Sequence, residues 1–197
     1  MATLYFKYGT MNSGKSAHLL MTNHNYAEQH KDTLIFKPSL DTRDGDIIHS
    51  RALGEKVAVN MINREFYNYM YEMAEKEQPH CVLVDEVQFM EEHQIEELAK
   101  IVDLLGIPVI CYGLLTDFQG KLFVGSKKLI ELGARLEEIK TVCWHCDVKA
   151  SFNLRLHDGE PIFFGEQIQV GGNESYRPIC RKCYLELKEE SVKATYL

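Results

Sequence analysis

Short apolar runs alternate with longer amphipathic segments along residues 1–141 of the chain. The runs predict strands over 3–8, 33–38, 81–86 and 107–114, and the amphipathic segments predict helices over 15–29, 64–77, 91–105 and 127–138. Two of the strands, 81–86 and 107–114, contain consecutive apolar residues, which is typical of strands buried on both faces of a parallel sheet. The alternation therefore predicts an α/β fold, with a parallel sheet flanked by helices.

The pattern changes at Cys143, where short extended stretches are separated by Gly and Asp turns. Two of these stretches, 150–156 and 166–170, lie between two C-x-x-C pairs. This change predicts an α/β domain over 1–141, a small β-rich metal-binding domain over 142–190 and a tail over 191–197. The sequence contains no internal repeat and no low-complexity tract.

Composition and charge narrow the class of protein. The 197 residues are 45% hydrophobic and 26% charged, which is ordinary for one globular domain with a small appendix. The net charge of −7 disfavours a protein whose main task is to grip a nucleic-acid backbone. No apolar run approaches the roughly 18 residues of a membrane span, and the N-terminus lacks the pattern of a secretory signal. We therefore expect a cytoplasmic protein that binds neither membranes nor nucleic acid.

The stretch GTMNSGKS, Gly9 to Ser16, satisfies G-x-x-x-x-G-K-[ST] between a predicted strand and a predicted helix. In such a loop, backbone N–H groups and the start of the helix bind phosphates. Lys15 would reach the β- and γ-phosphates and the Ser16 hydroxyl would bind Mg²⁺. The sequence thus predicts a site for a purine nucleoside triphosphate, formed by Gly9, Thr10, Met11, Asn12, Ser13, Gly14, Lys15 and Ser16. The alternative is a strand-to-helix turn that binds nothing.

Two adjacent carboxylates, Asp85 and Glu86, end the apolar run Val82–Val84. They suit a solvated loop edge, a metal site, or a metal ligand beside a catalytic base. Beside a phosphate loop, Asp85 fits the carboxylate of the Mg²⁺ shell, and Glu86 is free to accept a proton. Water as the proton donor gives an ATPase and a substrate hydroxyl gives a kinase, and the pair alone does not choose. Glu86 also suits a helix cap or a surface position.

The six cysteines fall into two groups. Cys81 and Cys111 lie inside apolar strands, where cysteine is typically a small buried hydrophobe. The other four form the pairs Cys143/Cys146 and Cys180/Cys183, which are separated by 33 residues. Four thiolates complete a closed tetrahedral shell, which predicts a structural zinc site. A redox dithiol is the competing interpretation, and His145 or His157 is a possible substitute ligand.

Five motifs extend the argument to a family. The segments YFKYGTMNSGKS, LDTRD, VLVDEVQF, CYGLLTDFQGKLF and VGGNESYRPICRKC occur in the order found in type II thymidine kinases, over roughly residues 3–184. The resemblance implies a P-loop (RecA-like) sheet with a zinc-ribbon-like β appendix. It implies transfer of the γ-phosphate of ATP to the 5′-hydroxyl of thymidine, with Mg²⁺ and structural Zn²⁺. It also implies a homotetramer that is inhibited by dTTP.

The resemblance assigns roles to individual residues. Glu86 corresponds to the general base, Asp85 to the Mg²⁺ ligand, and Asp41, Arg43 and Gln88 to the ATP side. Residues 167–176 correspond to a lasso that closes over thymidine. The implied nucleoside contacts are Met11, Phe89, Phe118, Phe123, Ile168, Val170, Gly171 and Tyr176. For the three phenylalanines the alternative is ordinary core packing. This chain has Leu115 where many members of that family carry Arg. It has Thr10 and Asn12 where one branch of the family has Pro and an aromatic residue.

Two other classes of protein remain as rivals. One is a zinc-ribbon P-loop ATPase that acts on nucleic acid and uses Glu86 to activate water. The other is a purely structural or binding module. Net charge, chain length and the lasso-like segment favour the kinase.

Overall fold

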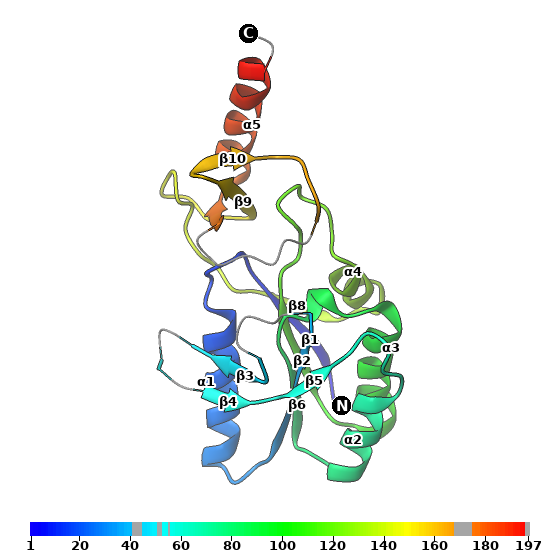
Figure 1. The fold of residues 1–197 in the computed structure, drawn as a ribbon. Coiled ribbons are helices and arrows are strands. Elements are labelled where there is room, and N and C mark those ends of the chain that lie inside the picture. The colour runs from blue at the N-terminus through cyan, green and yellow to red at the C-terminus, as the bar shows by residue number, and fades with distance from the viewer. Residues whose placement is uncertain (41–44, 51–52, 55, 168–174, 196–197) are drawn as a thin grey trace.

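The computed structural model describes residues 1–40, 45–50, 53–54, 56–167 and 175–195 (Figure 1). It consists of an α/β domain and a smaller lobe, which we call the cysteine lobe and which begins at Cys143. The expected domain boundary near 141–142 stays a prediction. No helix within the described ranges combines the length and apolar character needed to cross a membrane.

A six-stranded sheet forms the centre of the α/β domain. Every neighbouring pair in it is parallel, and the strand order is β5-β2-β6-β7-β1-β8. The strands are β1 (Leu4–Tyr8), β2 (Thr33–Pro38), β5 (Asn60–Ile62), β6 (Cys81–Val84), β7 (Val109–Gly113) and β8 (Arg135–Glu138). All residues of β6 are buried, as the continuous apolar run predicts. The predicted parallel α/β fold is confirmed.

Helices cover both faces of this sheet (Figure 1). Helix α1 (Lys15–Glu28) lies on one face, beside the small hairpin of β3 (Ile47–His49) and β4 (Lys56–Ala58). The other face carries α2 (Tyr69–Glu77), α3 (Glu92–Lys100), the π-helical turn η2 (Ile101–Leu105) and α4 (Val124–Glu131). A 3₁₀ turn, η1 (Val87–Phe89), follows β6. Separate buried clusters fill the two faces, with Phe6 and Phe36 in one cluster and Leu19 and Leu20 in the other.

The predicted helix over 127–138 is wrong in its second half. Helix α4 ends at Glu131, Gly133 takes a left-handed φ of 72°, and residues 135–138 form β8 at the edge of the sheet. An edge strand has one neighbour and exposed side chains, so its charged sequence gives no strand-like alternation. The three-residue strands β3, β4 and β5 were also not predicted, and α2 begins at Tyr69 rather than at residue 64.

The cysteine lobe is a three-stranded antiparallel sheet with a helix. Its strands are β9 (Phe152–His157), β10 (Glu160–Ile162) and β11 (Tyr176–Ile179), in the order β10-β9-β11. Helix α5 (Arg181–Thr195) extends away from the α/β domain (Figure 1), and it runs across the expected boundary at residue 191. The predicted extended stretch 150–156 corresponds to β9, whereas most of 166–170 lies outside the described residues.

Candidate active site

The candidate catalytic residues gather at the carboxyl edge of the sheet. The loop Gly9–Gly14 follows β1, Asp85 and Glu86 follow β6, and Leu114 follows β7, which lies between these two strands. Because parallel strands end at the same edge, their following loops meet there, which is the usual ligand-binding position of such sheets. The structure therefore brings the phosphate loop and both carboxylates together.

The structure of the phosphate loop favours glycine at two positions, Gly9 and Gly14. Gly14 precedes α1 with a φ of 84°, a left-handed conformation that favours glycine. At Gly9, an added Cβ would lie 2.4 Å from Ser13 Oγ and 2.6 Å from the Ile139 carbonyl oxygen. Lys15 is 8% exposed and its Nζ donates to the Thr10 carbonyl, 2.8 Å away. The lysine ammonium is thus held over the loop.

Two hydroxyl groups of this loop fit phosphate oxygens. Thr10 Oγ1 and Ser13 Oγ are buried and, within the described part of the chain, have no hydrogen-bond partner. Because an unpaired buried hydroxyl is costly, such groups usually meet a ligand or an ordered solvent molecule. Together with Lys15 and the start of α1, they form a set of donors suited to a polyphosphate.

Asp85 is buried and linked to the phosphate loop. Its Oδ2 accepts a hydrogen bond from Ser16 Oγ at 3.1 Å, and its Oδ1 accepts one from the Glu86 N–H at 3.0 Å. Burial, and next the neighbouring charge of Glu86, raise the pKa of the Asp85 carboxyl. A divalent cation at this position would stabilise the ionised carboxylate. The donor set of a serine hydroxyl and a carboxylate is one that Mg²⁺ favours.

Glu86 is held by a different set of contacts. Its backbone is left-handed, with a φ of 50°, at the entry to η1. Its Oε2 accepts a hydrogen bond from Gln88 Nε2 at 2.5 Å, and Gln88 Oε1 accepts the Leu114 N–H at 3.0 Å. Gln88 is 2% exposed, so its amide forms a buried connection between Glu86 and the end of β7. The resemblance assigned Gln88 to the ATP side, and such a contact stays a prediction.

The aromatic candidates occupy two places. Phe89 is half-buried and packs edge-to-face on the buried Phe123, with ring centroids 5.8 Å apart. Phe89 also borders a pocket of about 180 Å³ whose walls include Pro38 and Ile62, the last residues of β2 and β5. Phe118 is 1% exposed and lies where the cysteine lobe meets the α/β domain, since its carbonyl accepts the Tyr184 hydroxyl at 2.9 Å.

Of the remaining predicted site residues, five lie outside the residues that the structure describes and two can be placed. Asp41, Arg43, Ile168, Val170 and Gly171 lie outside the described residues. Tyr176, the first residue of β11, is half-buried. Met11 is partly buried, and its N–H donates to Asn153 Oδ1 at 2.7 Å. The contact joins the phosphate loop to β9 of the cysteine lobe.

Sequence reasoning missed two buried polar residues of β9, Asn153 and Arg155. Both side chains bind groups near the candidate site rather than the interior of the cysteine lobe. The signal was the alternation in FNLRLH, in which polar residues at 153 and 155 flank the apolar Leu154. The alternation indicates two differently occupied faces but does not say what the polar face meets.

The four paired cysteines converge as predicted. Their sulfur atoms all lie within 4.8 Å of one another, and the backbone N–H of His145 donates to Cys143 Sγ at 3.4 Å. In the second pair, the backbone N–H of Cys183 itself donates to Cys180 Sγ at 3.5 Å. Cys146 Sγ lies 3.7 Å from Cys180 Sγ and 3.6 Å from Cys183 Sγ. Tetrahedral zinc with sulfur at about 2.3 Å would place the sulfurs about 3.8 Å apart, so the cluster fits this metal.

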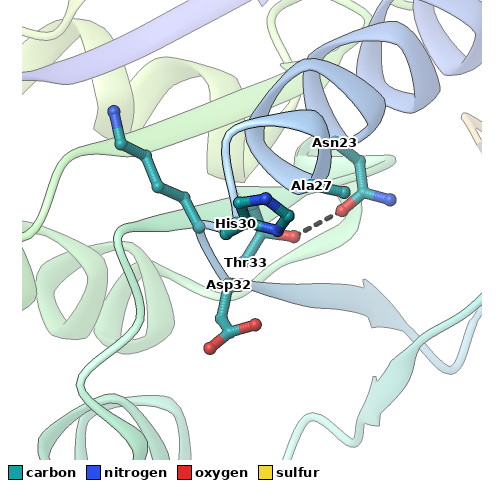
Figure 2. Close-up of a pocket in the computed structure, with 6 residues that line it drawn as sticks. Asn23, Ala27, His30, Asp32 and Thr33 are labelled. Atoms are coloured by element: carbon teal, nitrogen blue, oxygen red, sulfur yellow. Dashed lines mark hydrogen bonds between the residues drawn. The ribbon is translucent and has the colours of Figure 1, made fainter.

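A larger concavity lies at the opposite edge of the sheet, away from these residues. It has a volume of about 480 Å³ and is lined by Asn23, Ala27, His30, Lys31, Asp32 and Thr33. Figure 2 shows that Asp32 points away from His30, and that the drawn hydrogen bond joins Thr33 to Asn23. The titratable groups do not converge, and Thr33 begins β2, so the concavity lies at the amino ends of the strands.

Replacing Gly9 with Ala tests the phosphate loop. The new Cβ would overlap Ser13 Oγ and the Ile139 carbonyl, so we expect the loop to distort and ATP affinity to fall by about 10-fold or more. Titration calorimetry with ATP and Mg²⁺ measures this change. Gly159→Ala is the control, because it also strains the backbone, through a left-handed φ of 85° rather than an overlap, but lies in the cysteine lobe. Equal ATP affinity in the two variants would contradict the prediction.

Comparisons with known proteins identify the family. The family model of thymidine kinase matches residues 2–184. A thymidine kinase of Lactococcus lactis is 47% identical over 186 residues, which cover 94% of this chain and 98% of that protein. A thymidine kinase of Streptococcus gordonii is 46% identical over 188 residues, covering 94% of this chain and 97% of that protein.

The solved structures add little. A crystal structure of Bacteroides Pif1 bound to ssDNA aligns with a TM-score of 0.39 and 13% identity, over 70% of this chain and 38% of that one. That similarity is too low to support a conclusion. The family match and the relatives, by contrast, cover nearly the whole chain, including the phosphate loop, both carboxylates and the four clustered cysteines. The chain belongs to the thymidine kinase family, the family that its five motifs resemble.

Proposed function

We propose that the chain transfers the γ-phosphate of ATP to the 5′-hydroxyl of thymidine, giving dTMP, with Glu86 as the general base. Membership of the thymidine kinase family supports the reaction. The observation that carries the residue roles is the division of contacts at the end of β6. Asp85 accepts a hydrogen bond from Ser16 of the phosphate loop, whereas the Glu86 carboxylate accepts one from Gln88.

The phosphate side consists of residues 9–16, with Asp85. Backbone N–H groups of the loop and Lys15 hold the β- and γ-phosphates, and Thr10 Oγ1 and Ser13 Oγ offer further donors. Ser16 and Asp85 would hold Mg²⁺, which when bound offsets the negative charge of the phosphates. Asp41, Arg43 and Gln88 complete the ATP side in this proposal.

Glu86 acts on the nucleoside. Its carboxylate accepts the proton of the 5′-hydroxyl as the 5′-oxygen attacks the γ-phosphorus. The new bond joins the 5′-oxygen to phosphorus, and the bond between phosphorus and the bridging oxygen of ADP breaks. Gln88 Nε2 donates to Glu86 Oε2, which keeps this carboxylate oriented.

The nucleoside side is built from apolar and aromatic residues. We assign the thymine and sugar contacts to Met11, Phe89, Phe118, Phe123, Ile168, Val170, Gly171 and Tyr176. Support comes from the half-buried Phe89 packed on Phe123, and from the bond between the Met11 N–H and Asn153. The Met11 contact lies on the side of the phosphate loop that faces the cysteine lobe.

Zinc completes the proposal as a structural metal. Cys143, Cys146, Cys180 and Cys183 would hold it with four thiolates, which leaves no open position for substrate. The corresponding domain is residues 142–190. Assembly as a homotetramer and inhibition by dTTP are proposals that rest on the family resemblance alone, whereas a cytoplasmic location is proposed from the sequence features as well.

The reaction is tested with radiolabelled thymidine and Mg²⁺–ATP. We expect labelled dTMP to form with one ADP per thymidine consumed, and little ADP to form without thymidine. The rival ATPase predicts steady ATP hydrolysis that thymidine does not change and that nucleic acid stimulates. That second result would overturn the proposed kinase.

A further inference from the structure

The turn Thr116–Gly120 of the α/β domain is built around a buried carboxylate. Asp117 is 3% exposed, and its Oδ1 accepts the N–H groups of Gln119 at 2.8 Å and Lys121 at 2.9 Å. Backbone donors therefore satisfy this oxygen without a cation. The turn carries Phe118 at a fixed position, between two residues whose backbone is held by hydrogen bonds.

The cysteine lobe is joined to this turn along residues 165–167. Each of these three consecutive residues makes a hydrogen bond with a residue outside the segment. The bonds are Gln119 Nε2 to Gly165 O (3.1 Å), Arg155 Nη1 to Glu166 O (2.8 Å) and Gln167 Nε2 to Asp117 Oδ2 (2.9 Å). Two of them end on the turn itself, and the third comes from β9.

Arg155 connects the segment to Phe118. Its guanidinium carbon lies 4.8 Å from the centroid of the Phe118 ring, while the same group donates to the Glu166 carbonyl. Arg155 is 6% exposed and forms no ion pair with any residue that the structure describes. A buried cation is costly unless its surroundings compensate, and here the carbonyl oxygen and the aromatic face do so.

The direction of the Arg155 side chain follows from the strand. In β9, Leu154 is 1% exposed and belongs to the core of the cysteine lobe. Since side chains alternate along a strand, Asn153 and Arg155 share the opposite face. Asn153 meets the Met11 N–H of the phosphate loop, so this polar face of β9 is turned toward the α/β domain. Arg155 thus contributes to the junction of the two parts rather than to the lobe's core.

We propose that Arg155 is a positioning residue for the nucleoside. By stacking on Phe118 and binding the Glu166 carbonyl, it fixes one aromatic wall of the base pocket and the adjacent residues 165–167 in a single arrangement. The inference rests on the proposed function, because that function assigns Phe118 to the thymine side. Arg155 lies on the nucleoside side, so its loss affects thymidine binding more than ATP binding.

Steady-state kinetics of Arg155→Met test the proposal. Methionine keeps the apolar length of the side chain but removes both the charge and the hydrogen bond. We expect the KM for thymidine to rise by about 10-fold or more, with changes in the KM for ATP and in kcat below about 3-fold. Arg177→Met is the matched control, since Arg177 stacks on Trp144 at 5.1 Å, a contact confined to the cysteine lobe.

Two further variants separate positioning from folding. Arg155→Lys keeps a cation but lacks the planar fork that stacks and donates together, so we expect it to raise the thymidine KM as well. Zinc content and circular dichroism show whether each variant is folded, and Arg155→Lys gives the readout if Arg155→Met does not fold. In a Phe118→Leu background, Arg155→Met should raise the thymidine KM much less than in the wild type, because the stacked pair is already broken.

The outcomes distinguish this inference from the proposed function. A wild-type protein without thymidine-dependent ADP formation would overturn the proposed function. An active wild type whose folded Arg155 variants keep the thymidine KM, or change both KM values equally, would overturn the positioning role and leave the function intact. Full additivity of the Arg155 and Phe118 variants would likewise overturn it.

Discussion

Replacing Glu86 with Gln should lower kcat by about 100-fold or more while leaving the KM values for ATP and thymidine within a few-fold of the wild type. Glutamine has the shape of glutamate but cannot accept the proton of the 5′-hydroxyl. Gln88 Nε2 can still donate to a side-chain oxygen at position 86, so the local structure should be retained. Rapid-quench measurement of dTMP formation separates this chemical step from product release.

The neighbouring carboxylate should behave differently. Asp85→Asn removes a buried group that accepts the Ser16 hydroxyl, so we expect a higher Mg²⁺ requirement as well as a lower rate. Glu92→Gln is the control for Glu86, because the Glu92 carboxylate lies on α3, is 57% exposed and forms an ion pair with Lys128 at 4.0 Å. An unchanged kcat in Glu86→Gln would remove Glu86 as the base and revive its interpretation as a helix cap, since Glu86 is the N-cap of η1.

The sequence predicted those parts of the fold and site that depend on residues close together in the chain. The strands β6 and β7 were predictable, because burial on both faces requires consecutive apolar residues such as Val82–Val84. The phosphate loop was predictable because its chemistry requires glycine and lysine at fixed spacing. In both cases the sequence pattern and the physical requirement lie within a few neighbouring residues.

The junction with the cysteine lobe was not predictable in this way. Asn153 binds the N–H of Met11, which is 142 residues away along the chain, and Arg155 stacks on Phe118. Polar residues on a strand read equally well as a solvated face, and only the packed structure shows that they are buried. The same holds for Asp117, whose carboxylate meets backbone N–H groups and a glutamine rather than a cation.

Loss of the proposed zinc should have an effect as large as loss of the base. The buried core of the cysteine lobe consists, among the residues described, of Cys143, Leu154, Phe163, Ile179, Cys180 and Tyr184. Two of these are proposed metal ligands, so the lobe has little apolar core apart from the metal site. Small domains of this kind depend on metal binding for much of their folding free energy.

We therefore expect Cys146→Ser to lose zinc and to lower thymidine phosphorylation by about 100-fold or more, because an unfolded lobe releases residues 165–167 and Arg155 from the nucleoside side. ATP binding should survive, since the α/β domain has its own buried clusters on both faces of the sheet.

For Cys146→Ser, elemental analysis measures the zinc content, calorimetry measures ATP binding, and the dTMP assay measures thymidine phosphorylation. His145→Ala is the control, because His145 lies inside the same C-x-x-C pair but is exposed and not part of the sulfur cluster. It should keep one zinc per chain and full activity. A zinc-free Cys146→Ser variant that phosphorylates thymidine normally would show that the metal does not support the site, and would favour the redox interpretation of the cysteines.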